Sequence, residues 1–217
     1  MTKSKKRTEK AGTRLLTLVV DRSGSMEPIK DDMEGGIKTL IEEQAREEGT
    51  CLVTLAQFDN EYEVVADGVP AAEMAPYRLV PRGMTALLDA IGRTIATVHA
   101  RIESMDPKDR PQNMLFAVIT DGMENASCEW SRLQVMDSVK ARTAEGWHFT
   151  FLGADQDAVQ EGRGLGVDAD ASLTWEKSAR GTAGAMRSMS DSYRRLRRGE
   201  ATRVEYTEEE RKAATGD

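Results

Sequence analysis

A carboxylate and two hydroxyl groups follow an apolar segment near the start of the chain. Residues 15–20 are predicted to form a strand, and the polar side chains that come after it are Asp21, Ser23 and Ser25. In a turn, alternate residues can point the same way, so these three oxygen side chains can share one ion. Oxygen ligands of this kind suit a hard divalent cation such as Mg²⁺.

The same residues also have a simpler interpretation, because Ser and Asp after a strand commonly form turns or cap helices. Two further stretches favour the metal hypothesis. Thr85 opens a strongly helical pattern, and Asp121 ends a second apolar strand over 114–120. In open α/β sheets, ligands gather outside the carboxyl ends of the strands. Taken alone, Thr85 could cap its helix, and Asp121 with Gly122 could form an ordinary turn.

The three stretches together resemble the von Willebrand factor A (VWA) family with its metal-ion-dependent adhesion site (MIDAS). They read D-R-S-G-S, G-M-T-A-L and I-T-D-G, and they occur in the family's order within residues 13–200. Met84 stands where many members have a second glycine before the threonine. The resemblance implies that the metal is held by Asp21, Ser23, Ser25, Thr85 and Asp121.

The resemblance implies a three-layer, Rossmann-like α/β fold with a mostly parallel central sheet, one antiparallel edge strand and helices on both faces. Independently, the alternation of strand-like and helix-like segments favours α/β layering. A hairpin over 51–58 and 62–66 is expected to supply the antiparallel edge. We expect a VWA domain over 13–199, a basic disordered tail over 1–12 and a charged tail over 200–217.

In this family a Glu or Asp of a partner protein commonly completes the shell of the metal. The resemblance therefore implies a protein-binding adaptor rather than an enzyme, with Mg²⁺ as the expected ion and Mn²⁺ or Ca²⁺ as alternatives. Bacterial relatives of this small form often act beside chaperone-like ATPases or in stress and phage-associated gene clusters. An ATPase subunit is thus one expected partner, and a bacterial or phage origin is expected. The identity of the partner and the oligomeric state stay open.

A metal-dependent hydrolase, acting on phosphate esters through Asp21, is the alternative function. No histidine is joined by Ser or Cys in a spacing typical of a catalytic triad. The chain also lacks the glycine-rich motifs that bind nucleotides.

Composition bears on the size of the core, the class of partner and the cellular compartment. The 217 residues, 39% of them hydrophobic, can bury a full core, and the net charge of −7 gives no general reason to bind nucleic acid. Two cysteines without metal-ligand spacing are typical of a reducing compartment. No apolar run suits a signal peptide or a membrane span, so a cytoplasmic location is expected.

Overall fold

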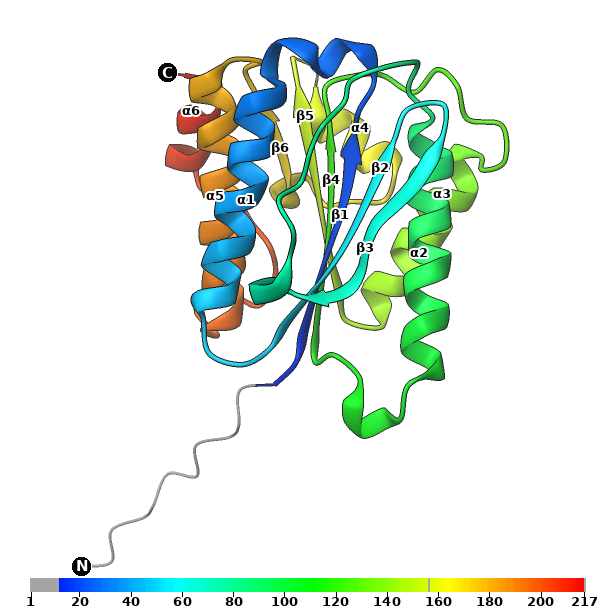
Figure 1. The fold of residues 1–217 in the computed structure, drawn as a ribbon, viewed down its shortest axis with the longest axis vertical. Coiled ribbons are helices and arrows are strands. Elements are labelled where there is room, and N and C mark those ends of the chain that lie inside the picture. The colour runs from blue at the N-terminus through cyan, green and yellow to red at the C-terminus, as the bar shows by residue number, and fades with distance from the viewer. Residues whose placement is uncertain (1–11, 156, 217) are drawn as a thin grey trace, which may run out of the picture.

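The computed structural model describes residues 12–155 and 157–216. A six-stranded sheet forms the middle layer, and helices cover both of its faces (Figure 1). In spatial order the strands are β3 (Tyr62–Pro70), β2 (Cys51–Phe58), β1 (Arg14–Asp21), β4 (Asn113–Thr120), β5 (Trp147–Ala154) and β6 (Ser172–Trp175). Neighbouring strands are parallel except β2 and β3. The predicted α/β fold, with its antiparallel edge strand, is confirmed.

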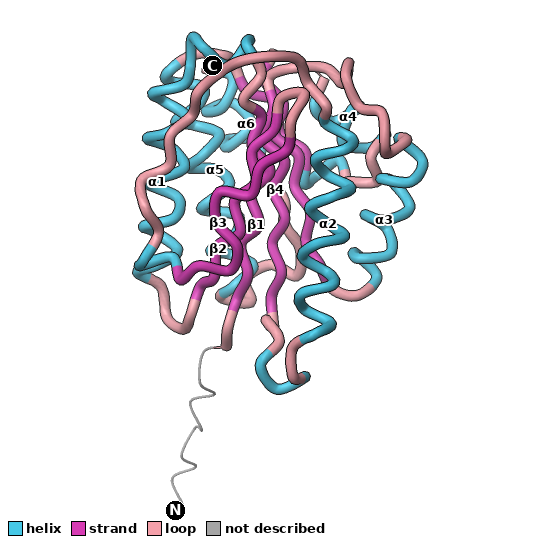
Figure 2. The backbone as a smooth tube through the Cα atoms, turned by 45° about the vertical axis from the view of Figure 1, so that its right-hand side comes forward, coloured by secondary structure: helices cyan, strands magenta, loops and turns pink. Residues whose placement is uncertain are grey.

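The central strand β1 is buried from Arg14 to Asp21. Its continuous apolar run is typical of a parallel strand that is covered on both faces. Two sets of helices provide that cover, and Figure 2 shows the sheet between them. One set is α1 (Lys30–Arg46), α5 (Ala179–Arg197) and α6 (Glu208–Thr215), and the other is α2 (Leu87–Ser104), α3 (Arg132–Ala144) and α4 (Ala158–Gly164).

The order of the strands reverses at β1. The chain passes from β1 through the short 3-10 helix η1 (Gly24–Ile29) and α1 to β2, on one side of β1. It returns through α2, on the opposite face of the sheet, to β4 on the other side of β1. In open α/β sheets such a reversal of strand order leaves a crevice at the carboxyl ends of the strands, where ligands bind.

Gly36 of α1 allows two helices to approach closely. A Cβ at this position would lie 2.5 Å from Cγ of Met186 in α5. The glycine therefore serves packing against α5. No close contact requires a glycine at position 35, because a Cβ there would meet no atom within 4 Å.

The ends of the chain differ from the expected tails in one respect. Residues 1–11 of the expected N-terminal tail lie outside the described residues. At the other end, residues 200–216 pack onto the domain instead of extending from it, since Val204, Tyr206 and Ala214 are buried. The Glu176 N–H donates a hydrogen bond to the carbonyl of Ala214 (2.9 Å), which joins α6 to the end of β6. A few apolar residues within a charged segment are enough to dock it.

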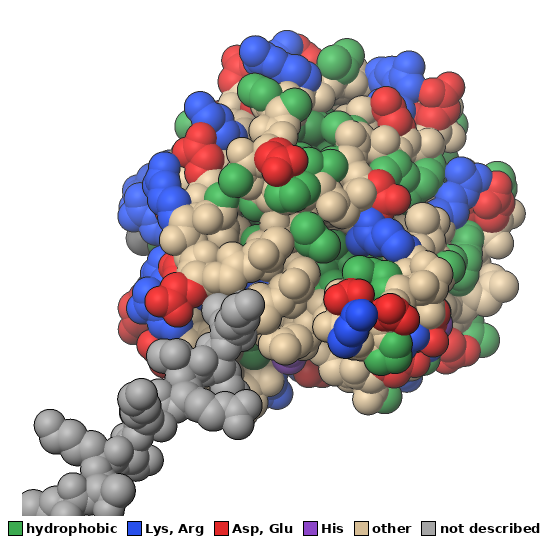
Figure 3. All heavy atoms as spheres, turned by 60° about the horizontal axis from the view of Figure 1, so that its bottom comes forward, with side chains coloured by type: hydrophobic (Ala, Val, Ile, Leu, Met, Phe, Trp, Pro, Cys, Tyr) green, Lys and Arg blue, Asp and Glu red, His purple; other side chains and the backbone are tan. Residues whose placement is uncertain are grey.

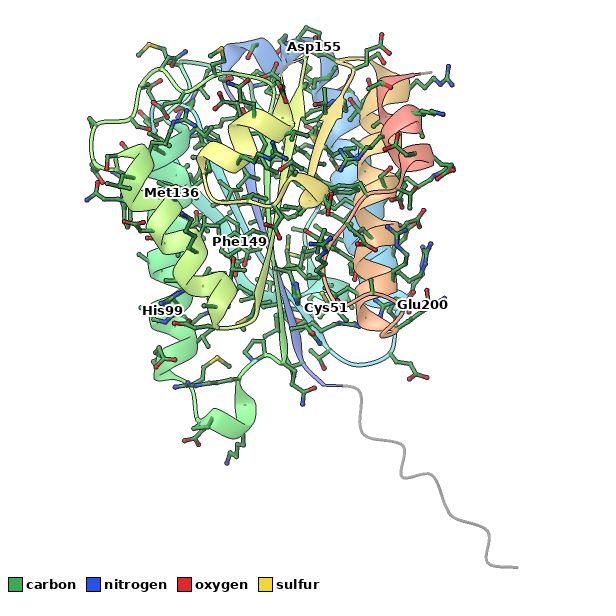
Figure 4. All side chains as sticks on the ribbon, turned by 180° about the vertical axis from the view of Figure 1, so that it is seen from behind. Cys51, His99, Met136, Phe149, Asp155 and Glu200 are labelled. Atoms are coloured by element: carbon green, nitrogen blue, oxygen red, sulfur yellow. The ribbon has the colours of Figure 1, made fainter. Side chains whose placement is uncertain are left out.

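Arginines at the C-terminal end of α5 pair with acidic side chains of neighbouring segments. Arg195 contacts Glu210 at 2.7 Å, and Arg197 pairs with Glu47. Figure 4 places Glu200, which follows α5, at the lower end of the molecule. On that end of the molecule basic and acidic side chains lie next to one another (Figure 3), so neither sign of charge dominates this face.

Within the described residues, no helix has the length and apolar character that crossing a membrane requires.

Candidate metal centre

Asp21 is the last residue of β1, and its side chain is held from two directions. Its Oδ1 accepts a hydrogen bond from the Ser23 N–H, and its Oδ2 accepts one from the Thr120 hydroxyl, both at 2.6 Å. Val20 pairs with Ile119 across β1 and β4, so Asp21 and Thr120 lie level at the same edge of the sheet. The parallel register therefore determines where this carboxylate stands.

The carboxyl of Asp21 is fully buried, and this burial raises its pKa to about 6. The hydrogen bonds from Thr120 and Ser23 act in the opposite direction, and the nearby carboxylate of Asp121 adds to the rise. A group whose charged form is disfavoured in this way is stabilised when a cation is placed beside it. A positive ion beside Asp21 would therefore stabilise its ionised carboxylate.

Hydroxyl groups connect this carboxylate to Asp121. The Ser23 and Ser25 Oγ atoms are 3.0 Å apart, and the Ser25 hydroxyl donates to Oδ1 of Asp121 at 2.7 Å. Ser23 stands immediately before η1, but its side chain makes no capping hydrogen bond. The interpretation of this serine as a helix cap is therefore wrong.

Thr85 is buried, and its hydroxyl makes no hydrogen bond within the described residues. It does not cap α2, because the Leu88 N–H at the start of that helix donates to Oε2 of Glu124 (2.9 Å). The backbone of Thr85 is tied instead to Asn125 by two bonds. Its N–H donates to Asn125 Oδ1 (2.9 Å), and its carbonyl accepts from the Asn125 N–H (3.1 Å). The loop after β4 thereby positions the Thr85 hydroxyl.

Gly122 shows how close Thr85 and Asp21 lie. A Cβ built on Gly122 would be 3.0 Å from Thr85 Oγ1 and 3.6 Å from Asp21 Oδ2. The two oxygens therefore face the same small space beside Gly122. With the contacts described above, the structure brings together all of the residues that the sequence analysis singled out, namely Asp21, Ser23, Ser25, Thr85 and Asp121.

An ionic cluster that the sequence analysis missed holds two of these loops together. Asp59 is buried at the end of β2, and its Oδ2 accepts hydrogen bonds from Arg22 Nε (3.0 Å) and Arg82 Nε (2.7 Å). The Arg82 N–H donates to the Arg22 carbonyl, and the Ala86 N–H donates to the Asp59 carbonyl, both at 2.8 Å. The cluster thus fixes the Thr85 loop against the first motif. An aspartate directly after a strand was the available signal, but the predicted hairpin over 51–58 and 62–66 leaves Asp59 in its connecting turn.

Lys177 is the second residue that sequence reasoning missed. Its Nζ lies 2.5 Å from Oδ2 of Asp121, although more than fifty residues separate the two along the chain. This oxygen is buried, and the ammonium of Lys177 forms an ion pair with it. No sequence motif gave a signal for this contact.

The residues present fit a hard divalent cation on three observations. The donors are two carboxylates and three hydroxyls, which are the oxygen ligands that Mg²⁺ accepts. Asp121 Oδ2 is a buried carboxylate oxygen that already holds one cation, the ammonium of Lys177. The glycine at position 122 leaves space that any larger side chain would fill. Within the described residues, no three His, Cys, Asp or Glu side chains gather as a metal cluster, in keeping with a site rich in hydroxyls.

Solved structures with the same fold have low sequence identity to this chain. The proximal thread matrix protein 1 (PTMP1) of the mussel byssus is 16% identical, with a TM-score of 0.60 over 82% of this chain and 45% of its own. A PTMP1 structure with a zinc-occupied MIDAS motif is 15% identical, with a TM-score of 0.57 over 83% of this chain and 48% of its own. The pilus adhesin SpaC of Lactobacillus rhamnosus GG is 15% identical, with a TM-score of 0.61 over 85% of this chain and 30% of its own.

A von Willebrand factor type A protein of Catenulispora acidiphila gives a TM-score of 0.55 at 18% identity, over 83% of this chain and 42% of its own. The chain has a von Willebrand factor A fold. It spans less than half the length of each of these VWA proteins. No protein-family model and no curated protein matches the sequence. The VWA fold, predicted from the three motifs, is thus confirmed by structural likeness.

Proposed function

We propose that the chain is a protein-binding module that depends on a divalent metal ion, with Mg²⁺ or Mn²⁺ held by Asp21, Ser23, Ser25, Thr85 and Asp121. The observation that carries this proposal is the convergence of five oxygen side chains, from three separate loops, at the carboxyl edge of the sheet. The zinc-occupied MIDAS motif of PTMP1 supports a metal ion at this place in the fold.

When bound, the ion would supply a positively charged coordination position for an oxygen ligand from outside. The residues of the chain favour such a position, because three of the five donors are neutral hydroxyls. One of the two carboxylates, that of Asp121, is already paired with Lys177. The protein ligands thus neutralise only part of the positive charge of the ion. The Glu or Asp of a partner protein is the additional ligand that we propose.

Exposed apolar side chains beside the site support a protein as the partner. Met84 directly precedes Thr85 and is 56% exposed, and Met123 directly follows Gly122 and is 68% exposed. Methionine is over-used at adaptable binding surfaces, because its side chain is flexible and polarisable. The partner would then combine an acidic side chain with apolar contacts. An adaptor role beside an ATPase and a cytoplasmic location stay predictions.

No observation favours the alternative of a hydrolase that uses Asp21. Both carboxylate oxygens of Asp21 accept hydrogen bonds, from the Ser23 N–H and the Thr120 hydroxyl. These hydrogen bonds orient the carboxylate and do not themselves point to a catalytic role.

The first test is calorimetric titration of Mg²⁺ and Mn²⁺ into the purified chain. We expect saturable binding in the wild type, its loss in Asp21→Ala, and unchanged binding in Asp137→Ala, which removes an exposed carboxylate of α3. Circular dichroism of each variant checks the fold. Equal affinity of the wild type and a folded Asp21→Ala variant would refute the metal assignment.

The second test concerns the partner. The wild type and Asp21→Ala are immobilised, and proteins from the native cell are captured in Mg²⁺ and in chelator. A partner of the site is retained by the wild type in Mg²⁺ alone. Capture that is equal in all arms would show binding through another surface and would contradict the proposed role of the metal.

A further inference from the structure

Lys177 reaches the metal centre from a part of the sheet that does not border it. The residue lies in the turn between β6 and α5, whereas Asp121 follows β4, and β5 stands between those two strands. Its Nζ lies 2.5 Å from Asp121 Oδ2. The lysine side chain is 20% exposed and the aspartate side chain is 0% exposed, so this ion pair is shielded from solvent on the aspartate side.

The backbone around Lys177 is fixed by Asp155, at the end of β5. The Asp155 Oδ1 accepts a hydrogen bond from the Lys177 N–H (3.2 Å), and the Asp155 N–H donates to the Trp175 carbonyl (3.0 Å). Among the described residues, Asp155 is the non-glycine residue with a positive φ, of 49°. Such a backbone is uncommon and persists where surrounding contacts hold it. Figure 4 labels Asp155 at the end of the molecule where the parallel strands finish.

The next residue also limits the movement of the turn. Ser178 is the N-cap of α5, and its Oγ accepts a hydrogen bond from the Gly181 N–H (3.1 Å). Its own N–H donates to the Glu176 carbonyl (2.8 Å). Lys177 is thus anchored on both sides, and its ammonium is delivered to Asp121 by an ordered segment.

The carboxylate of Asp121 is consequently shared between two contacts. Its Oδ1 accepts the hydrogen bond of Ser25, and its Oδ2 faces the ammonium of Lys177. Because the Asp121 carboxylate carries one negative charge, a positive charge held beside it reduces the attraction for any second cation. Removing that positive charge would leave the carboxylates of Asp21 and Asp121 without this counter-ion.

We propose that Lys177 is an internal counter-cation of the metal centre, which weakens binding of the divalent ion at Asp121 and so sets the ion concentration at which the centre fills. This role rests on the metal-dependent function proposed above. It concerns the occupancy of the centre, and it needs no knowledge of the partner.

The test is calorimetric titration of Mn²⁺ and Mg²⁺ into the wild type and three variants. We expect Lys177→Met to bind the ion more tightly, on the order of tenfold, because a nearby unit charge is removed. Lys177→Arg keeps the charge and is expected to stay close to the wild type. Lys140→Met removes an exposed lysine of α3 that belongs to none of the three motifs, and is expected to leave the affinity unchanged.

A second readout needs neither a variant nor a partner. Acetylation of lysine amines in the wild-type chain is followed by mass spectrometry, in chelator and at saturating Mn²⁺. If the two cations compete for Asp121, the rate at Lys177 rises several-fold with Mn²⁺, while the rate at Lys140 does not change. This readout decides the question if Lys177→Met does not fold.

The outcomes separate this inference from the proposed function. Unchanged or weaker ion binding in a folded Lys177→Met variant overturns the counter-cation role, while metal binding by the wild type still stands. An unchanged acetylation rate at Lys177 does the same. Absence of ion binding in the wild type and in every variant overturns the metal function itself and the role of Lys177 with it.

Discussion

The hydroxyl of Thr120 donates a hydrogen bond to Oδ2 of Asp21, and the two oxygens are 2.6 Å apart. Thr120 ends β4 and Asp21 ends β1, so this bond joins the carboxyl ends of the two central strands. It satisfies a buried acceptor, which would otherwise cost free energy. The orientation of the first motif's carboxylate therefore depends on a residue of a different motif.

Burial of Asp21 predicts that the stability of the metal-free protein depends on pH. Its pKa rises from an ordinary value of 3.8 to about 6, so between these two values the folded chain keeps a proton that the unfolded chain releases. The free energy of unfolding is expected to fall as pH rises from about 4 to 6, by up to about 3 kcal/mol from this group. Above pH 6 this contribution no longer changes.

Urea unfolding in chelator, at several pH values, measures this effect as a difference between the wild type and Asp21→Asn. The variant cannot titrate at this position, so the difference isolates the carboxyl from all other groups. Parallel pH profiles for the two proteins would contradict the prediction.

The same carboxyl predicts a pH dependence of metal binding. Asp21 must be ionised to attract the ion, so the affinity for Mn²⁺ is expected to fall about tenfold per pH unit below pH 6 and to level off above it. Titrations at pH 5, 6, 7 and 8 check this. A constant affinity across that range would argue that Asp21 does not take part.

Thr85 predicts a separation of stability from metal binding. Its hydroxyl makes no hydrogen bond in the described residues, so Thr85→Val is expected to change the free energy of unfolding by less than about 1 kcal/mol. Loss of the oxygen is expected to weaken metal binding on the order of tenfold or more. Thr85→Ser keeps the hydroxyl and should retain most of the affinity, which calorimetry of both variants would measure. Equal affinities in the two variants would remove Thr85 from the proposed site.

Asp59 predicts a structural effect at a distance from the ion. In Asp59→Asn the nearly buried guanidinium of Arg22 loses its ionised partner, and only the solvent-exposed Glu63 still pairs with it. We expect a loss of about 2 to 3 kcal/mol in the free energy of unfolding. Glu61→Gln is the matched control, since Glu61 and its partner Arg82 are both largely exposed, and a loss within about 1 kcal/mol is expected. Urea unfolding of both variants makes the comparison.

Gly122 predicts the effect of filling the space that the proposed ligands share. In Gly122→Ala the new methyl group would lie 3.0 Å from Thr85 Oγ1, which is too close unless the threonine moves. Metal affinity is expected to fall on the order of tenfold, with circular dichroism unchanged. Undiminished affinity would mean that the ion does not lie beside this glycine.

Local patterns predicted most of the fold, because they depend on residues that are close in the sequence. The apolar run of β1 and the helical pattern that becomes α2 are read directly from the chain. The segment that becomes α6 was harder to predict. Its charged residues resemble a solvated tail, and only contacts with α5 and β6 explain why Ala214 is buried.

The proposed ligands were found because family motifs mark them, whereas their supporting residues carry no such mark. Lys177 and Asp59 act through ion pairs to residues that are distant along the chain. Such pairs depend on strand order and on the path of each loop. A single sequence does not specify which charged side chain meets which, so these residues emerged only from the structure.

The packing of residues 200–216 limits where the chain can be truncated. The Tyr206 hydroxyl lies 2.6 Å from Thr150 Oγ1 in the middle of β5, and the Ser192 hydroxyl of α5 donates to the Glu205 carbonyl at 2.8 Å. A fragment that stops at residue 199 would open the interior to water along β5 and α5. Such a fragment would be prone to misfold or aggregate. Its failure to bind a metal would then not test the proposed metal ligands.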